Sequence, residues 1–266
     1  MFRRLSPPSS VRAAVDALAA VLFPAPCRIC GEPLTNASRI PICAACLSLF
    51  QPIGDPLCDC CGRPFASAVA VEAAVPLCRL CRAKFYSFDR ARSFARYDDF
   101  LSAAVLLLKY EQVTRLGDWF AARLAETLAR TAGAQFDAVV AVPLHADRER
   151  ERGYNQAELI AKPLAKRLGR RFLRGVLIRT KPRPAQLVLS RAEHWKSVRG
   201  AYAIRERAQV DNLRILLIDD VLTTGATLDA CSRALKRAGA KGVMGLTVGR
   251  VIPGDSRAIG QQFGPR

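Results

Sequence analysis

The sequence predicts an α/β protein, a parallel β-sheet flanked by helices, with a cysteine-rich metal-binding module before it. Three observations support this prediction. After about residue 85, short apolar stretches of strand length alternate with amphipathic helical stretches, which is typical of parallel sheets with crossover helices. Before that region, eight cysteines form four CxxC pairs. One apolar stretch runs into two aspartates and a threonine-rich loop, at the kind of strand end where open α/β sheets bind ligands.

The length and composition allow two domains. The chain has 266 residues, half of them hydrophobic, which is enough to bury at least one sizeable core. We expect an amphipathic segment over 1–26, a double zinc-binding domain over 27–84, the α/β domain over 85–251 and a flexible tail over 252–266. Arg3 and Arg4 precede an apolar run as in a secretory signal, but Asp16 interrupts that run and favours an amphipathic helix. No apolar stretch approaches the ~20 residues of a membrane span, so we expect a soluble protein.

The charge is strongly basic and unevenly placed. The formal net charge of +18 favours polyanionic partners or phosphate-bearing substrates. Residues 145–210 hold 17 Lys or Arg residues against 6 Asp or Glu residues, a net charge of +11. A surface that faces phosphate and an ordinary solvated basic face both explain this stretch.

The cysteines have the spacing of metal ligands and not of a disulfide framework, which indicates a reducing compartment, the cytoplasm. Each group of two CxxC pairs supplies four soft ligands for one tetrahedral zinc ion, and such a closed shell predicts two structural zinc ions. Iron–sulfur binding is the main alternative. Cys60 breaks the two-residue spacing and is left out of the ligand set. The predicted ligands are Cys27, Cys30, Cys43 and Cys46 in the first group and Cys58, Cys61, Cys78 and Cys81 in the second.

The α/β region contains the candidate ligand site. We predict strands over 137–144 and 214–219, a helix that ends at Gly169 and a helix that ends at Gly239, with Cys231 on its apolar face. Asp219 and Asp220 end the second strand, where carboxylates suit ribose hydroxyls or a bound magnesium ion. An N-capped helix after an acidic turn is the alternative, but it explains only one hydroxyl. The loop that follows offers hydroxyls, a glycine and helix N-terminal amides for a phosphate, from Thr223, Thr224, Gly225, Ala226 and Thr227.

The stretch "ILLIDDVLTTGAT" resembles the ribose-phosphate signature of the type I phosphoribosyltransferases, whose ligand is 5-phosphoribosyl 1-pyrophosphate (PRPP). Upstream, "AVPLHADRERERGYNQAELIAKPLAKRLG" and "RPAQLVLSRAEHWKSVRGAY", behind tandem cysteine knuckles, more narrowly resemble the ComF family of competence-associated phosphoribosyltransferase-like proteins. The likeness runs from about residue 27 to residue 251. It implies a type I phosphoribosyltransferase-like sheet behind a double zinc ribbon.

The resemblance also implies roles for individual residues. It assigns Asp219 and Asp220 to the ribose hydroxyls, residues 223–227 to the 5′-phosphate, and Pro143, Leu144 and His145 to a loop near the pyrophosphate, with magnesium accompanying PRPP. A lysine is usual at the position of Lys109, to which no role is assigned. His194 stands where the family commonly has an arginine, which puts a basic function there in doubt.

Three further assignments have alternatives that the sequence leaves open. Arg152 either faces an anion or decorates an exposed helix of alternating charge. The imidazole of His145 is either a general base or a satisfied hydrogen-bonding group. The stretch 181–191, which is polar, basic and contains two prolines, is either a mobile flap that closes over PRPP or a plain surface loop.

Two functions fit these patterns. The first is a glycosyltransferase that displaces pyrophosphate from PRPP with a nitrogen nucleophile, although the sequence identifies no acceptor. The second is a nucleic-acid-associated competence factor that keeps the PRPP site as a sensor or relic. For this second function the resemblance implies a role in DNA uptake, with single-stranded DNA or DNA-uptake proteins as partners. Only 7% of the residues are aromatic, and no basic patch interleaves with aromatics, so this function rests on the resemblance.

Overall fold

A computed structural model describes residues 25–34, 40–65, 75–182 and 190–252 of the chain. The chain forms two compact units, residues 1–50 and residues 51–266. Most of the expected N-terminal amphipathic segment, nearly all of the C-terminal tail and residues 183–189 of the candidate flap lie outside the described residues. No helix among the described residues is long and apolar enough to cross a membrane.

The first unit contains the first cysteine group. Cys27 and Cys30 lie on a turn, and Cys43 and Cys46 lie at the start of α2 (Ala44–Ser48). The Cys43 side chain caps this helix by accepting a hydrogen bond from the backbone N–H of Cys46.

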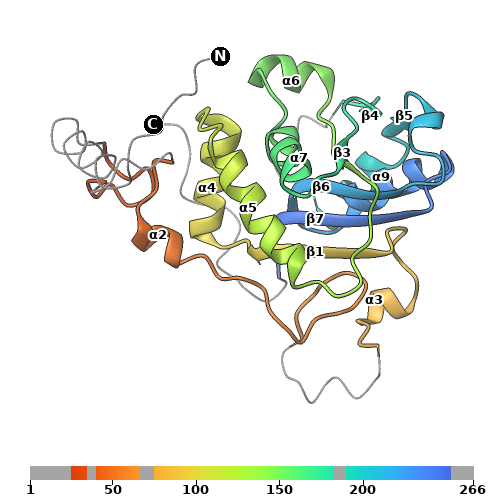
Figure 1. The fold of residues 1–266 in the computed structure, drawn as a ribbon, viewed down its shortest axis with the longest axis horizontal. Helices are drawn as coiled ribbons and strands as arrows, with labels where there is room; N and C mark the ends of the chain where they lie inside the picture. The colour runs from red at the N-terminus through yellow and green to blue at the C-terminus, as the bar shows by residue number, and fades with distance from the viewer. Residues whose placement is uncertain (1–24, 35–39, 66–74, 183–189, 253–266) are drawn as a thin grey trace, which may run out of the picture. The chain divides into compact units, whose positions relative to one another are not determined.

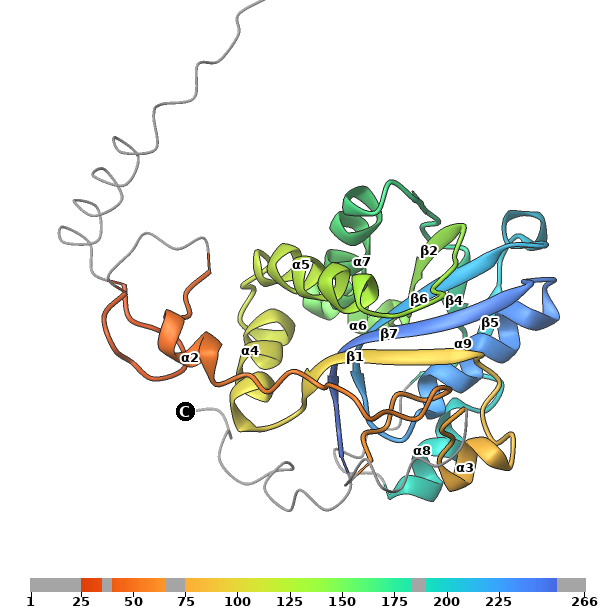
Figure 2. The same ribbon diagram turned by 60° about the horizontal axis from the view of Figure 1, so that its bottom comes forward.

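The second unit is a twisted sheet with helices on both faces (Figures 1 and 2). Its elements, in chain order, are α3 (Arg79–Arg82), β1 (Arg90–Arg96), α4 (Asp99–Tyr110), α5 (Leu116–Ala129), β2 (Ala138–Ala141), α6 (Ala146–Arg152), α7 (Gln156–Arg167), β3 (Arg171–Phe172), β4 (Leu177–Arg179), α8 (Arg191–Val198), β5 (Tyr202–Ile204), the 3-10 helix η2 (Arg207–Gln209), β6 (Arg214–Leu222), α9 (Ala226–Arg237) and β7 (Gly242–Arg250).

The main sheet is parallel throughout, in the strand order β1-β7-β6-β2-β3, which confirms the predicted fold class. Helices α5 and α7 cover one face and α9 covers the other (Figure 2). From β2 the chain crosses over to β3 on one side, and from β6 it crosses over to β7 on the other. The order therefore reverses between β2 and β6, and a ligand crevice is expected outside the carboxyl ends of these two neighbours.

The centre of the sheet is hydrophobic because its strands are covered on both faces. Ile215, Leu216, Leu217 and Ile218 of β6 are all almost fully buried, as expected for a central parallel strand. Strand β6 is longer than the predicted strand, because it continues past Asp219 to Leu222. Its pairing with β2 ends at Ile218, whereas its pairing with β7 continues to Leu222. Asp219 and Asp220 thus lie inside the strand and beyond the end of β2.

The second cysteine group belongs to the α/β unit. The compact units divide after Phe50, so this group lies in the unit of residues 51–266, and the expected domain boundary at residue 84 stays a prediction. Cys58, Cys61, Cys78 and Cys81 are buried in the same hydrophobic cluster as residues of the sheet and of α9. Backbone and side-chain hydrogen bonds fix them there: the Ala91 N–H donates to the Cys60 carbonyl, and the buried Arg250 guanidinium donates to the Cys61 carbonyl at 2.6 Å. CxxC spacing alone does not encode this burial.

Candidate functional site

The carboxylate pair lies in the last part of β6, beyond the point where β6 pairs with β2. Asp219 and Asp220 are 8% and 6% exposed, so both carboxylates are largely removed from water. The Asp220 N–H donates to Asp219 Oδ1 at 2.9 Å, and the Val221 N–H donates to Asp220 Oδ1 at 2.8 Å. These local bonds hold the two side chains at the strand end.

A half-buried lysine forms an ion pair with one of the two carboxylates. Lys109 Nζ, from the last turn of α4, lies 2.5 Å from Asp220 Oδ2, and Gln156 Nε2 of α7 donates to the same oxygen at 3.4 Å. Burial alone would raise the pKa of Asp220, but the Lys109 ammonium holds it below the ordinary value. Burial and the neighbouring Asp220 charge raise the pKa of Asp219 well above its ordinary value. Burial would lower the pKa of Lys109, but the Asp220 carboxylate raises it.

The threonine loop leads directly into α9. Gly225 has φ of +84°, a left-handed conformation that favours glycine, and an added Cβ there would lie 2.7 Å from Tyr86 Cε1. The next N–H groups, from Ala226 onward, begin the helix, and a first turn leaves such groups without intrahelical partners. Thr223 is exposed, and Thr224 and Thr227 are half-buried. The loop thus presents hydroxyls and helix N-terminal amides within one short stretch.

Two long-range contacts shape this loop. The Tyr86 hydroxyl donates to the Thr224 carbonyl at 3.2 Å. Thr224 Oγ1 lies 3.1 Å from Nδ1 of His194, which comes from α8, and it also accepts from the Ala226 N–H at 3.3 Å. His194, whose basic function was in doubt, therefore lies against the loop predicted to hold phosphate.

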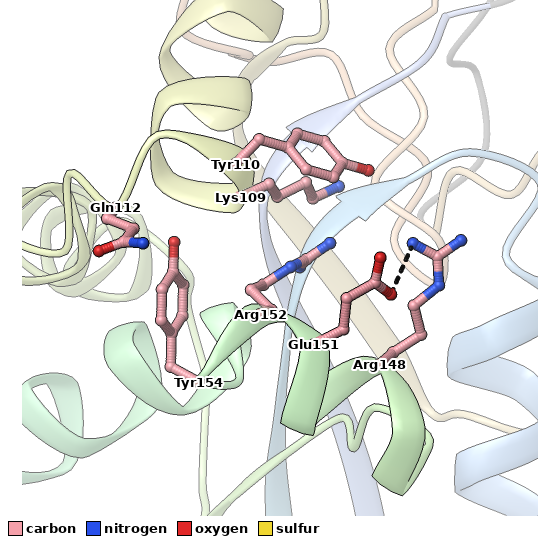
Figure 3. Close-up of a pocket in the computed structure, with 7 residues that line it drawn as sticks. All are labelled: Lys109, Tyr110, Gln112, Arg148, Glu151, Arg152 and Tyr154. Carbon is pink, nitrogen blue, oxygen red and sulfur yellow. Dashed lines mark ion pairs between the residues drawn. The ribbon is translucent and has the colours of Figure 1, made fainter.

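A cation-lined cavity, whose lining is drawn in Figure 3, adjoins the carboxylate pair through Lys109, which lines the cavity and contacts Asp220. Its volume is about 160 Å³. Among the residues that line it, the Arg152 guanidinium lies over the Tyr110 ring, 5.0 Å from the ring centre. An adjoining cavity of about 90 Å³ shares several of these residues. The larger cavity is lined by Lys109, Tyr110, Gln112, Arg148, Glu151, Arg152 and Tyr154, and the smaller one adds Leu144, His145, Gln156 and Arg179.

The loop after β2 reaches the smaller cavity. Leu144 and His145 line it, and Pro143 precedes them in the same loop. His145 caps α6 through Nδ1, which accepts from the Asp147 N–H at 3.4 Å and lies 3.2 Å from the Asp147 carboxylate. This arrangement matches the satisfied hydrogen-bonding alternative for His145. Arg152 donates to Gln156, which in turn contacts Asp220, so Arg152 is connected to the carboxylate pair.

The eight cysteines form two compact groups that fit zinc. Within each group the sulfur atoms lie within 4.8 Å of one another. Zn–S bonds of about 2.3 Å in a tetrahedron separate the sulfurs by roughly 3.8 Å. The Sγ–Sγ distance is 3.8 Å between Cys27 and Cys46, 3.7 Å between Cys30 and Cys43, and 3.7 Å between Cys61 and Cys78. Cys60 lies outside both groups, and the thiols form no disulfide in the part of the chain that the structure describes.

A zinc-ribbon module, a parallel sheet and a strand-end loop that suits a sugar phosphate define a phosphoribosyltransferase-type protein. Comparisons with known families agree, since residues 18–83 match the Double zinc ribbon domain and residues 120–249 match the Phosphoribosyl transferase domain. The chain is 31% identical to DNA utilization protein YhgH of Salmonella typhimurium over 222 residues, which cover 82% of this chain and 93% of that protein. It therefore belongs to the family of YhgH and the ComF competence proteins.

Other relatives are more distant. Competence protein ComFC of Bacillus subtilis is 27% identical over 210 residues, which cover 74% of this chain and 79% of that protein. Among solved structures, the glutamine PRPP amidotransferase of B. subtilis shows a TM-score of 0.38 at 19% identity, covering 54% of this chain and 30% of that one. An adenine phosphoribosyl transferase from Trypanosoma brucei shows a TM-score of 0.33 at 15% identity, covering 65% of this chain and 76% of that one.

Sequence reasoning left several residues around the site without a role. Lys109, Gln156 and Tyr86 contact the carboxylate pair or the threonine loop from distant parts of the chain. For Lys109 a signal exists in the sequence: it lies four and eight residues after Val105 and Leu101, both fully buried on α4. A lysine on the apolar side of a helix indicates a buried anionic partner. No comparable signal points to Tyr86, because Phe85, Tyr86 and Phe88 together read as core.

Proposed function

We propose that the α/β domain binds PRPP at the carboxyl ends of β2 and β6. The observation that carries this proposal is the arrangement on β6 and α9, a buried carboxylate pair followed within a few residues by a loop of hydroxyls and helix N-terminal amides. The 5′-phosphate would occupy the loop of residues 223–227, where positive partial charge gathers. Asp219 and Asp220 would accept hydrogen bonds from the ribose hydroxyls.

The cation-lined cavities suit the pyrophosphate end of the same ligand. Lys109, Arg148, Arg152 and Arg179 line the two cavities against the single carboxylate of Glu151, so positive charge dominates there. Displacing pyrophosphate creates positive charge on the ribose and negative charge on the leaving group. Carboxylates at the ring and cations at the leaving group stabilise both charges. Magnesium would accompany the pyrophosphate and neutralise it further.

Titration calorimetry with PRPP and magnesium tests this assignment. A Gly225→Val variant should lose measurable PRPP binding. The larger side chain would clash with Tyr86 and would keep the phosphate away from the backbone amides of the loop. Gly133→Val is its matched control, since Gly133 also has positive φ (+67°) but has open space around its Cβ position. An Asp219→Asn, Asp220→Asn double variant should keep its fold and lose any pyrophosphate release. Unchanged PRPP affinity in both the Gly225 and the double-aspartate variants would reject the site.

A second candidate function is contact with DNA, which the names of the relatives and the net charge of +11 over residues 145–210 favour. In this function the PRPP site would act as a sensor or a relic. PRPP binding without turnover on any acceptor base would favour it over a transferase. A screen for pyrophosphate release over candidate nitrogen bases separates the two.

The cysteine groups have a structural role in this proposal. Four thiolates leave no open position for water or substrate, so each zinc ion would hold its segment in place and take no part in the reaction. Free thiols in CxxC pairs persist in a reducing compartment, and we propose the cytoplasm as the location.

A further inference from the structure

The position of Lys109 at the carboxylate pair has a consequence for metal binding. Lys109 lies on α4 in line with Leu101 and Val105, which are both fully buried, so the helix delivers its ammonium group to the interior edge of the sheet. Its side chain is 20% exposed, and that of its partner Asp220 is 9% exposed. At 2.5 Å between Nζ and Oδ2, the two groups form a close, largely desolvated ion pair.

The protein already engages three of the four carboxylate oxygens of the pair. Asp219 Oδ1 accepts from the Asp220 N–H, and Asp220 Oδ1 accepts from the Val221 N–H. Asp220 Oδ2 receives both Lys109 Nζ and Gln156 Nε2. A divalent cation needs several hard oxygen ligands, and it would have to sit beside an ammonium group of the same charge sign.

Lys109 also faces the cavities beside the pair. It lines both of them together with Arg152, and Figure 3 shows the Lys109 side chain extending from α4 and the Arg152 side chain extending from α6. One cation therefore lies between the carboxylates and the space that suits a pyrophosphate group.

We propose that Lys109 is the resident counter-cation of the Asp219–Asp220 pair. The pair then holds no divalent cation of its own, and magnesium enters only as a complex with the pyrophosphate end of the ligand. When ribose hydroxyls donate hydrogen bonds to the Asp220 carboxylate, the Lys109 ammonium is released from it and turns toward the pyrophosphate. The role of Lys109 as counter-cation stands on the ion pair alone. The entry of magnesium with the pyrophosphate and the turn of Lys109 rest on the proposed PRPP function.

The test uses the full zinc-loaded chain and Mn²⁺ as a paramagnetic probe, measured by electron paramagnetic resonance without PRPP. The wild-type protein should take up no Mn²⁺ that depends on Asp220. Lys109→Met should gain one Mn²⁺ site with affinity improved by about tenfold or more, because a like charge has been removed from beside the pair. Adding Asp220→Asn to that variant should abolish the new site. Lys162→Met, which removes one charge from an exposed position of α7, is the matched control and should gain no site.

A wild-type Mn²⁺ site that Asp220→Asn removes would overturn the proposal. The absence of a new site in both Lys109→Met and Lys109→Gln would also overturn it, provided that the variants unfold as cooperatively as the wild type. The glutamine variant covers the case in which the methionine variant fails to fold. A PRPP titration with and without magnesium completes the test, with a stronger magnesium dependence expected in Lys109→Met. If PRPP fails to bind under any condition, the proposed function falls and the Mn²⁺ result still decides the role of Lys109.

Discussion

At the scale of single residues, Tyr86 connects the threonine loop to a part of the chain far away in sequence. Its hydroxyl donates to the Thr224 carbonyl, and its ring fills the space in front of Gly225. The ring also stacks on Phe88 with centroids 4.7 Å apart. Burial raises the pKa of Tyr86 to about 12, so the hydroxyl stays protonated and keeps donating at physiological pH.

Removing only this hydroxyl should therefore loosen the loop. We expect Tyr86→Phe to weaken PRPP binding by about 0.5 to 1.5 kcal/mol, the usual contribution of one neutral hydrogen bond. Calorimetry would measure it, and an unchanged melting temperature would exclude a general loss of fold. Equal affinities in the two proteins would show that the loop needs no support from Tyr86.

Because the folded pKa of Tyr86 exceeds the unfolded value near 10, the stabilisation of the fold by Tyr86 should persist to about pH 10 and decline toward pH 12.

How much of the site the sequence could predict depends on how local each contact is. Asp219, Asp220 and the threonine loop form one continuous stretch, and a strand followed by a helix places them together without further information. The contacts from Lys109 and Tyr86 join residues more than a hundred positions apart. Such contacts follow from the strand order, which one sequence without relatives does not specify.

At the scale of elements, the two cysteine groups have similar spacing but different surroundings. The first belongs to its own compact unit, and Cys30 is exposed. In the second, all four cysteines are buried within the hydrophobic cluster that contains Phe88 and Ala91. The Phe85 N–H also donates to the Leu80 carbonyl at the end of the second group, one residue before Tyr86. The second group therefore supports the sheet and the segment behind the threonine loop.

This difference predicts unequal effects of removing one ligand from each group. The wild-type protein should carry about two zinc ions, one for each set of four thiolates. Cys27→Ser should lower the content to about one and leave the unfolding of the α/β unit unchanged. Cys61→Ser should also lose one ion, but it should lower the melting temperature of the α/β unit, because it disrupts a buried cluster.

Elemental analysis and calorimetric melting of both variants would test this prediction. Cys61 is 2% exposed, and this burial is the reason to expect a larger effect from the second group. Iron in place of zinc would contradict the metal assignment. Identical melting behaviour of the two variants would contradict the distinction between the groups.

The two strands and two helices predicted from hydrophobic patterns are present and differ only at their ends, whereas β1, α4, α5 and β7 were not predicted although they are also rich in buried residues. The strands around 138–141 and 214–222 and the helices α7 and α9 lie where the patterns indicate. The short strands β3, β4 and β5 have two or three residues each, too few for a periodic pattern. Their pairing depends on neighbours, which explains why the sequence did not reveal them.

At the scale of the whole molecule, the net charge of +18 predicts that any contact with DNA is mainly electrostatic. Binding of single-stranded DNA should then weaken steeply with salt, with a slope of log K against log salt of about −0.7 for each phosphate neutralised.

The carboxylate pair contributes negative charge, and Asp219→Asn with Asp220→Asn removes it. We expect this double variant to retain DNA binding or bind slightly more tightly, although it no longer binds PRPP productively. Fluorescence anisotropy across a salt series, run beside PRPP calorimetry on the same preparations, measures both properties. Joint loss of DNA and PRPP binding in a folded double variant would show that the two ligands share one site; a flat salt series would show that basic residues do not carry the DNA contact.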